Sequence, residues 1–182
     1  QGRYRMAEKA FEKLLEMYPD YERSPVAEME LLQALEKRLN TAEANRRRVA
    51  LFTKYNSEGD WAKKHSSARV VAAGDSVAAT ALYDAAVSYH QEALQDNDSA
   101  SYARAASCYR NFIRHYPKRP AANECHYNYA EILFSLGDYE QAAREYMAVS
   151  KRYPDSKFRE TAAWNAIVAS QNLLKRETEV RQ

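Results

Sequence analysis

The chain has 182 residues, of which 46% are hydrophobic and 29% charged, and its formal net charge is +2. This length suits one domain with a continuous core, and the composition is typical of folded globular proteins rather than disordered ones. Four glycines and five prolines are too few for the tight turns of a β-sandwich or β-barrel, so long helices are expected. No segment approaches the roughly 18 apolar residues of a membrane span, and the small net charge does not call for a nucleic-acid partner.

The periodicity of the apolar residues predicts about nine helices. Proline, glycine or short polar segments mark most of the breaks between them. The charged segment after residue 174 is expected to continue the last helix or to fray. The expected helices span residues 3–18, 24–39, 41–55, 61–73, 76–95, 101–116, 120–135, 138–153 and 157–174.

One sequence pattern occurs three times and ends each time in a Tyr-Pro pair. Fourteen residues before each of these tyrosines stands another tyrosine, followed at offsets of three, four and three residues by alanine, an aromatic residue and an apolar residue. These offsets trace one helix face, with the small residue where a neighbouring helix approaches, and proline then ends the helix. The copies are Tyr4, Ala7, Phe11, Leu14 and Tyr18; Tyr102, Ala105, Tyr109, Phe112 and Tyr116; and Tyr139, Ala142, Tyr146, Val149 and Tyr153.

A second series of aromatic residues is expected to open the partner helices. Its members are Tyr83, Tyr127 and Trp164, each followed by Asp or Asn. Between the two series, Gly137 can take the left-handed conformation that ends a helix, and Asp138 can cap the next helix. The repeating unit is therefore predicted to be an antiparallel helical hairpin.

This pattern resembles the tetratricopeptide repeat family. The resemblance implies an all-α, right-handed superhelical solenoid of antiparallel helix hairpins. The 37 residues between Tyr102 and Tyr139 differ from the family's usual repeat of about 34. The Tyr-Pro endings look similar to bacterial cell-envelope members, the outer-membrane assembly lipoproteins and the Tol-Pal-associated coordinator. They imply a periplasmic or outer-membrane location, with the cytoplasm as the alternative. The residues that carry the family resemblance are Gly137, Asp138, Tyr139, Ala142, Tyr146 and Pro154.

Residues 1–182 are expected to form a single solenoid that is a fragment of a longer array. Residues 1–19 align with the second half of a hairpin, which leaves that repeat without its first helix, and a signal peptide or lipid anchor could have been lost with it. Residues 20–100 are expected to form degenerate, irregular helical repeats, and residues 101–182 regular ones. Any membrane contact is expected through an anchor outside this chain.

A groove on the concave side is the expected binding surface, because the first helix of each hairpin lines that side in such solenoids. An asparagine amide can donate to and accept from a peptide backbone, and aromatic side chains add rigid contact area. The same aromatic residues also suit packing between repeats, and that interpretation stays open. The predicted groove residues are Tyr83, Asp84, His90, Tyr127, Asn128, Glu131, Trp164, Asn165 and Val168.

No catalytic motif and no metal-ligand spacing occurs in the sequence, so we expect neither an enzyme nor a cofactor nor a metal site. The four histidines and the two cysteines, Cys108 and Cys125, are interpreted as ordinary helix residues. Arg46, Arg47 and Arg48 make the central region locally basic. That patch suits an acidic partner, RNA or anionic lipid, or a solvated helix face.

The leading hypothesis is a non-catalytic scaffold that binds a partner protein or peptide within a bacterial envelope assembly. The alternative is a sensor of a small ligand or peptide, held in a pocket enclosed by the superhelix. Nucleic-acid binding through the central arginines is a third and weaker hypothesis.

Overall fold

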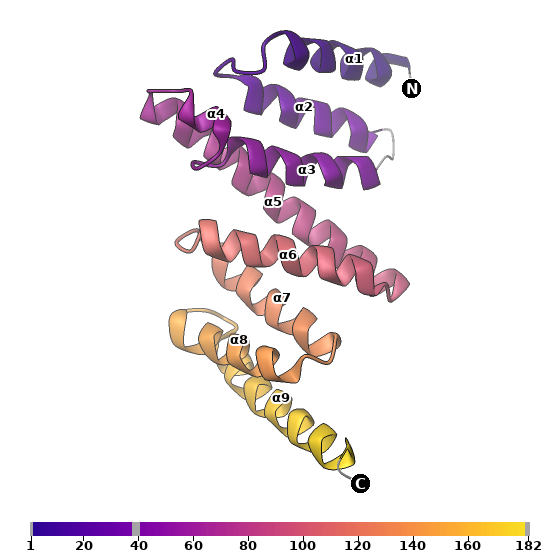
Figure 1. The fold of residues 1–182 in the computed structure, drawn as a ribbon, viewed down its shortest axis with the longest axis vertical. Coiled ribbons are helices and arrows are strands. Elements are labelled where there is room, and N and C mark those ends of the chain that lie inside the picture. Colours follow the sequence, from indigo (N-terminus) through magenta and orange to yellow (C-terminus); the bar gives the residue numbers. More distant parts are fainter. Residues whose placement is uncertain (1, 38–40, 181–182) are drawn as a thin grey trace. The chain divides into compact units, whose positions relative to one another are not determined.

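A computed structural model of the chain describes residues 2–37 and 41–180 (Figure 1). These residues are helical apart from short turns, and no strand occurs among them. The all-α fold built from helix hairpins is therefore confirmed. In the described ranges the helices are α1 (Gly2–Met17), α2 (Ser24–Lys37), α3 (Thr41–Tyr55), α4 (Asp60–Lys63), α5 (Ala68–Asp96), α6 (Ser99–His115), α7 (Ala122–Ser135), α8 (Tyr139–Arg152) and α9 (Arg159–Val180).

The chain forms two compact units, Gln1–Ser88 and Tyr89–Gln182, and the boundary between them lies within α5. In the first unit α1 packs on α2, and α2 packs on α3. In the second unit α6 packs on α7, α7 on α8, and α8 on α9. Helices that follow one another in sequence are thus neighbours in space within each unit, as in a helical repeat.

Trp61 is at the centre of the first unit's core. Its side chain is 1% exposed, and its ring packs edge-on against Tyr55 with the ring centroids 5.3 Å apart. The indole Nε1 donates a hydrogen bond of 3.3 Å to the carbonyl oxygen of Tyr21, which satisfies the polar atom of this large side chain. The short helix α4 therefore serves to insert one aromatic side chain between longer helices.

The second unit buries small residues where its helices approach one another and large ones beside them. Ala142, Tyr146 and Val149 on α8 are fully buried, as the repeat pattern predicts. On α9 the buried residues are alanines, including Ala162 and Ala166, which let α8 come close. The alternation of alanine with tyrosine thus fixes the spacing of the helices.

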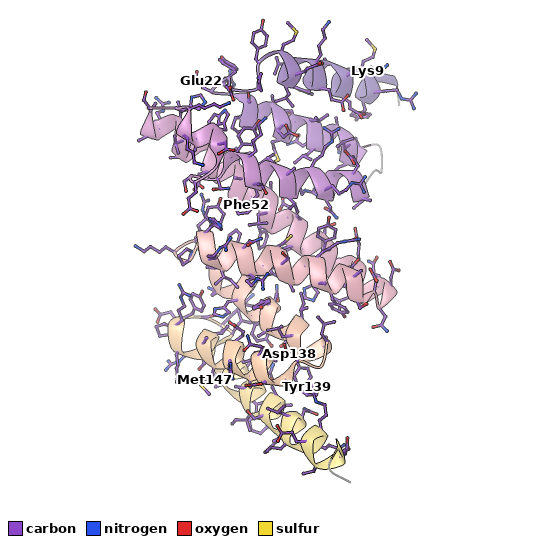
Figure 2. All side chains as sticks on the ribbon, viewed as in Figure 1. Lys9, Glu22, Phe52, Asp138, Tyr139 and Met147 are labelled. Carbon is purple, nitrogen blue, oxygen red and sulfur yellow. The ribbon has the colours of Figure 1, made fainter. Side chains whose placement is uncertain are left out.

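The turn between α7 and α8 has the chemistry that its sequence predicts. Gly137 has a φ of 77°, in the left-handed region that favours glycine, and Asp138 accepts a hydrogen bond of 3.3 Å from the backbone N–H of Gln141. Asp138 and Tyr139 are side by side at this turn (Figure 2). The Arg176 guanidinium on α9 donates a hydrogen bond of 2.8 Å to the Gly137 carbonyl and lies over the Tyr139 ring.

The middle of the chain corrects two expectations. The predicted helices 61–73 and 76–95 are instead α4, of four residues, and the continuous α5, of 29 residues. Gly74 lies inside α5, where a Cβ would stand 2.6 Å from the Trp61 ring, so glycine serves close packing here and does not break the helix. Tyr83 accordingly lies deep within α5 and does not open a helix.

By length and composition, α5 is the one helix in the described ranges that could cross a membrane, which corrects the expectation that no segment approaches such hydropathy. A core helix of a globular protein meets the same criteria. Ala78, Ala81, Leu82 and Ala85 are completely buried within the protein. Burial in the core thus accounts for part of the apolar character of α5, since 39% of its membrane-length window is buried.

The repeat positions of α1 differ in exposure from those of α6 and α8. Tyr4, Leu14 and Tyr18 are exposed, whereas Phe112 and Val149, which correspond to Leu14, are buried. The ring of His90 on α5 packs against the ring of Tyr109 on α6, and α8 packs on both α7 and α9. By contrast, α1 packs on α2. The same sequence pattern is thus buried or exposed according to the number of helices beside it.

Both cysteines are buried and unpaired. Burial raises the pKa of the Cys108 thiol to about 11, and burial raises that of Cys125 further. Since the thiolate is the reactive form, we expect a disulfide reagent to modify neither thiol of the native chain within minutes and both in denaturant. A colorimetric thiol assay measures this, and rapid modification of a native thiol would contradict the burial described above.

Candidate partner-binding surface

Helices α7 and α9 bring predicted groove residues together on adjoining faces. On α7, Tyr127 and Glu131 are four residues apart and therefore share one face. Asn165 of α9 donates from Nδ2 to the Tyr127 hydroxyl and to Glu131 Oε1, both at 3.1 Å. Asn165 thus forms one polar cluster with two residues that precede it by 38 and 34 positions in sequence. The repeat spacing predicts that these residues lie on the same side of the protein.

Tyr146 of α8 completes this cluster, although the sequence assigned it to the core. Its hydroxyl donates a hydrogen bond of 2.6 Å to Glu131 Oε1. Burial is the main cause that raises the pKa of Tyr146 and of Tyr127, and the hydrogen bonds to Glu131 raise both further. We name Tyr127, Glu131, Tyr146 and Asn165 the Glu131 cluster.

The Tyr127 ring is held in place by aromatic neighbours. It stacks on Phe158 with the centroids 4.5 Å apart and an interplanar angle of 12°, and it also contacts the Tyr146 ring. Such stacking limits rotation of the ring and supports packing between repeats. Tyr127 therefore takes part in inter-repeat packing, the interpretation left open by the sequence, while remaining half-exposed.

Asn128 belongs to a second, smaller network in the same unit. Its Nδ2 lies 3.3 Å from the Tyr109 hydroxyl, which in turn lies 3.5 Å from His90 Nδ1. Burial lowers the pKa of His90, and the nearby Glu131 carboxylate partly opposes this. His90 and Asn128, both predicted groove residues, are thus joined through a tyrosine of the intervening helix α6.

The Glu131 cluster fixes the orientation of the Asn165 amide. A carboxylate can only accept hydrogen bonds, so the amide nitrogen must be the atom that faces Glu131. The Asn165 carbonyl oxygen then points away from Glu131 and has no hydrogen-bond donor among the described residues. An acceptor held in one direction is what a backbone N–H of a bound peptide requires.

Trp164, next to Asn165, is the most exposed aromatic residue of the described chain, at 65%. Ile167 and Leu174 are also exposed and lie within about 80° of it around the helix axis, and Val168 is half-buried. Ile167 and Leu174 were missed by the sequence reasoning, although their offsets of three and ten residues from Trp164 are the signal that finds them. The exposed side of α9 thus carries three large apolar side chains among polar ones such as Gln171, beside the polar cluster.

Two predicted groove residues, Tyr83 and Asp84, lie in the other unit. Both are half-buried on α5. Burial raises the pKa of the Asp84 carboxyl, and Arg48 partly opposes the effect. Tyr83 and Asp84 belong to the first unit, and the other seven predicted groove residues belong to the second.

The basic patch of the central region is offset by carboxylates. Arg46 and Arg47 bond Glu43 at 2.6 and 2.7 Å, and Arg48 pairs with Glu36. These contacts reduce the local positive potential on which nucleic-acid binding depends. Among the described residues no group of three or more His, Cys, Asp or Glu side chains is placed to hold a metal ion.

Comparison with known proteins identifies the repeat. Models of the tetratricopeptide repeat match residues 98–157 and residues 1–21, which together make up less than half of the chain. No curated protein matches the sequence. Tetratricopeptide repeats generally mediate protein–protein interactions, and the matches do not distinguish the envelope type of repeat protein from others. Residues 98–157 and residues 1–21 therefore carry tetratricopeptide-repeat sequence.

Proposed function

We propose that this chain is a non-catalytic scaffold that binds a segment of a partner protein along the α7–α9 surface. The observation that carries the proposal is the pairing of an exposed Trp164 with the oriented amide of Asn165. Exposed tryptophans are frequent centres of protein interfaces, because they bury a large apolar area on binding.

The two parts of the surface suit different parts of a peptide. The apolar side of α9 at Trp164 and Ile167 offers area to a large side chain of the partner. The carbonyl oxygen of Asn165 offers an acceptor to the partner's backbone. Because Glu131 and Tyr127 already hold this amide, little side-chain entropy is lost when it binds.

The setting we propose is a bacterial envelope assembly, and the Tyr-Pro endings at Tyr116 and Tyr153 support it. Fractionation of the source cells, followed by detection with an antibody to the chain, tests this setting. Recovery with the periplasm or the outer membrane is expected. Recovery in the cytoplasmic fraction would reject the envelope setting and leave the binding proposal standing.

A binding measurement tests the surface itself. A pull-down from the source cells identifies the candidate partner, which is then purified and titrated into the chain by calorimetry. Trp164→Ala is expected to weaken binding by about 2 kcal/mol, roughly 30-fold, because an interface tryptophan of this kind dominates the affinity. A double variant, Tyr127→Ala with Asn128→Ala, is expected to weaken it as well.

Met147→Ala is the matched control, since Met147 is exposed on α8 rather than on α9 (Figure 2). It is expected to leave the affinity unchanged. Circular dichroism establishes that each variant remains folded. If Trp164→Ala and the double variant both bind with the original affinity, the α7–α9 surface is not the binding site.

A further inference from the structure

A cavity of about 560 Å³ lies between α6, α7 and α8, outside the α7–α9 surface. His126 and Tyr129 line it, and around the axis of α7 Tyr129 lies about 160° from Glu131. The cavity is therefore on the opposite side of α7 from the Glu131 cluster. Its ionisable lining residues are Arg110, Arg114, His126, Tyr129, Glu145 and Arg152.

Helical spacing explains why these residues meet. Arg110 and Arg114 are four residues apart on α6, and Glu145 and Arg152 are seven apart on α8, so each pair projects from one face of its helix. The arginines are exposed at the rim, whereas His126 is buried. The cavity thus has an arginine-bearing rim that leads to a buried histidine.

The three arginines make no ion pair with any acidic side chain in the described ranges. Arg114 donates to the neutral amide oxygen of Asn111 at 3.2 Å, and Arg152 lies over the Tyr153 ring. Arg110 hydrogen-bonds the Tyr129 side chain. None of these three partners is an acidic side chain, so the contacts do not neutralise the guanidinium charges. This differs from the arginines of α3, each of which pairs with a glutamate.

Glu145 is the one acidic residue of the lining, and it is already engaged. His126 Nε2 lies 2.7 Å from Glu145 Oε2, which joins α7 to α8 across the cavity. With His126 neutral, three arginines and one glutamate give the lining a formal charge of +3 − 1 = +2. The site therefore has an excess of positive charge in a concave space.

We propose that this cavity binds a small organic anion through Arg110, Arg114 and Arg152. A guanidinium presents parallel N–H donors that match a carboxylate or a phosphate, so either group suits the site. The volume lies within the range of about 300–1,000 Å³ found for small-molecule sites. Ile113 and Ala148 add apolar wall that would contact the carbon part of the ligand.

Calorimetric titration of the full chain with inorganic phosphate, with succinate and with a blocked acidic peptide tests the proposal. At low salt, saturable binding of one equivalent of phosphate or succinate is expected. Comparison of the phosphate and succinate titrations shows which of the two anions the site prefers. Arg110→Gln combined with Arg152→Gln is expected to weaken binding at least tenfold. Both residues are on the surface, so the fold is retained, as circular dichroism checks.

Arg144→Gln is the control, because Arg144 is an exposed arginine of α8 that pairs with Glu140 and does not line the cavity. It is expected to bind the anion as the original chain does, and so is Trp164→Ala. Absence of saturable binding by both small anions, or equal binding by the double variant, would overturn the proposal. Binding of the acidic peptide alone would overturn it in favour of a second protein-binding surface.

Discussion

Replacing Trp61 with alanine is expected to lower the free energy of unfolding of the first unit by about 3–5 kcal/mol. The substitution removes a side chain that is 1% exposed, the edge-on contact with Tyr55 and the hydrogen bond to Tyr21. Urea denaturation followed by circular dichroism measures the loss. The chain's other tryptophan is an internal control, because Trp164→Ala is expected to change stability by about 0.5 kcal/mol or less.

Gly74 offers a sharper test of the same packing. Gly74→Ala is expected to cost about 1–3 kcal/mol, since its Cβ would stand 2.6 Å from the rigid Trp61 ring. With Trp61→Ala already present, the same change is expected to stabilise the helix by about 1 kcal/mol, because alanine is the better helix former. If Gly74→Ala has the same effect in both backgrounds, Trp61 and Gly74 do not constrain each other.

Replacing Glu131 with leucine is expected to destabilise the second unit by about 2–3 kcal/mol. It leaves the Tyr146 hydroxyl and the Asn165 amide without their shared acceptor. Adding Tyr146→Phe removes one of the stranded donors and is expected to recover part of the loss. Glu140→Leu, on the exposed side of α8, is the control and is expected to change stability by about 0.5 kcal/mol or less. If Glu131→Leu and Glu140→Leu lower the stability equally, the hydrogen bonds of the Glu131 cluster do not stabilise the second unit.

The Glu131 cluster also makes stability depend on alkaline pH. Burial and the hydrogen bond to Glu131 raise the pKa of Tyr146 above its ordinary value of 10.0. Above that pH the unfolded chain releases a proton that the folded chain retains. The contribution of Tyr146 to the free energy of unfolding is therefore complete below pH 10.0 and decreases as the pH rises further. The urea midpoint is expected to fall less steeply with pH in Tyr146→Phe, and identical slopes would contradict this assignment.

The regular hairpins were predictable because their signals are local. Gly137 and Asp138 carry the turn chemistry within four residues, and α8 begins and ends within one residue of the range expected from them. The expected break between residues 73 and 76 was wrong for the opposite reason. Gly74 lies in that interval, and its role depends on Trp61, which is 13 residues away in sequence and meets it only in the folded core.

The relative positions of some candidate residues were predictable, whereas their hydrogen bonds were not. Repeat spacing places Tyr127 and Asn165 on adjoining helices, and the structure joins them by a hydrogen bond. Tyr146 was assigned to the core from its periodicity, which does not reveal where its hydroxyl points. The arginine-lined cavity depends on three helices at once, and no short sequence pattern relates Arg110 to Arg152.

The contact of Arg176 with the Gly137 carbonyl ties the end of the longest helix of the second unit to the turn of the preceding hairpin. Opening that turn breaks this bond as well as the cap at Asp138, and unwinding the end of α9 breaks it too. The opening of the turn and the unwinding of α9 are thermodynamically linked. Replacing Arg176 is therefore expected to accelerate hydrogen exchange in both segments. A hydrogen bond between residues 39 positions apart in sequence thus couples the end of α9 to the turn between α7 and α8.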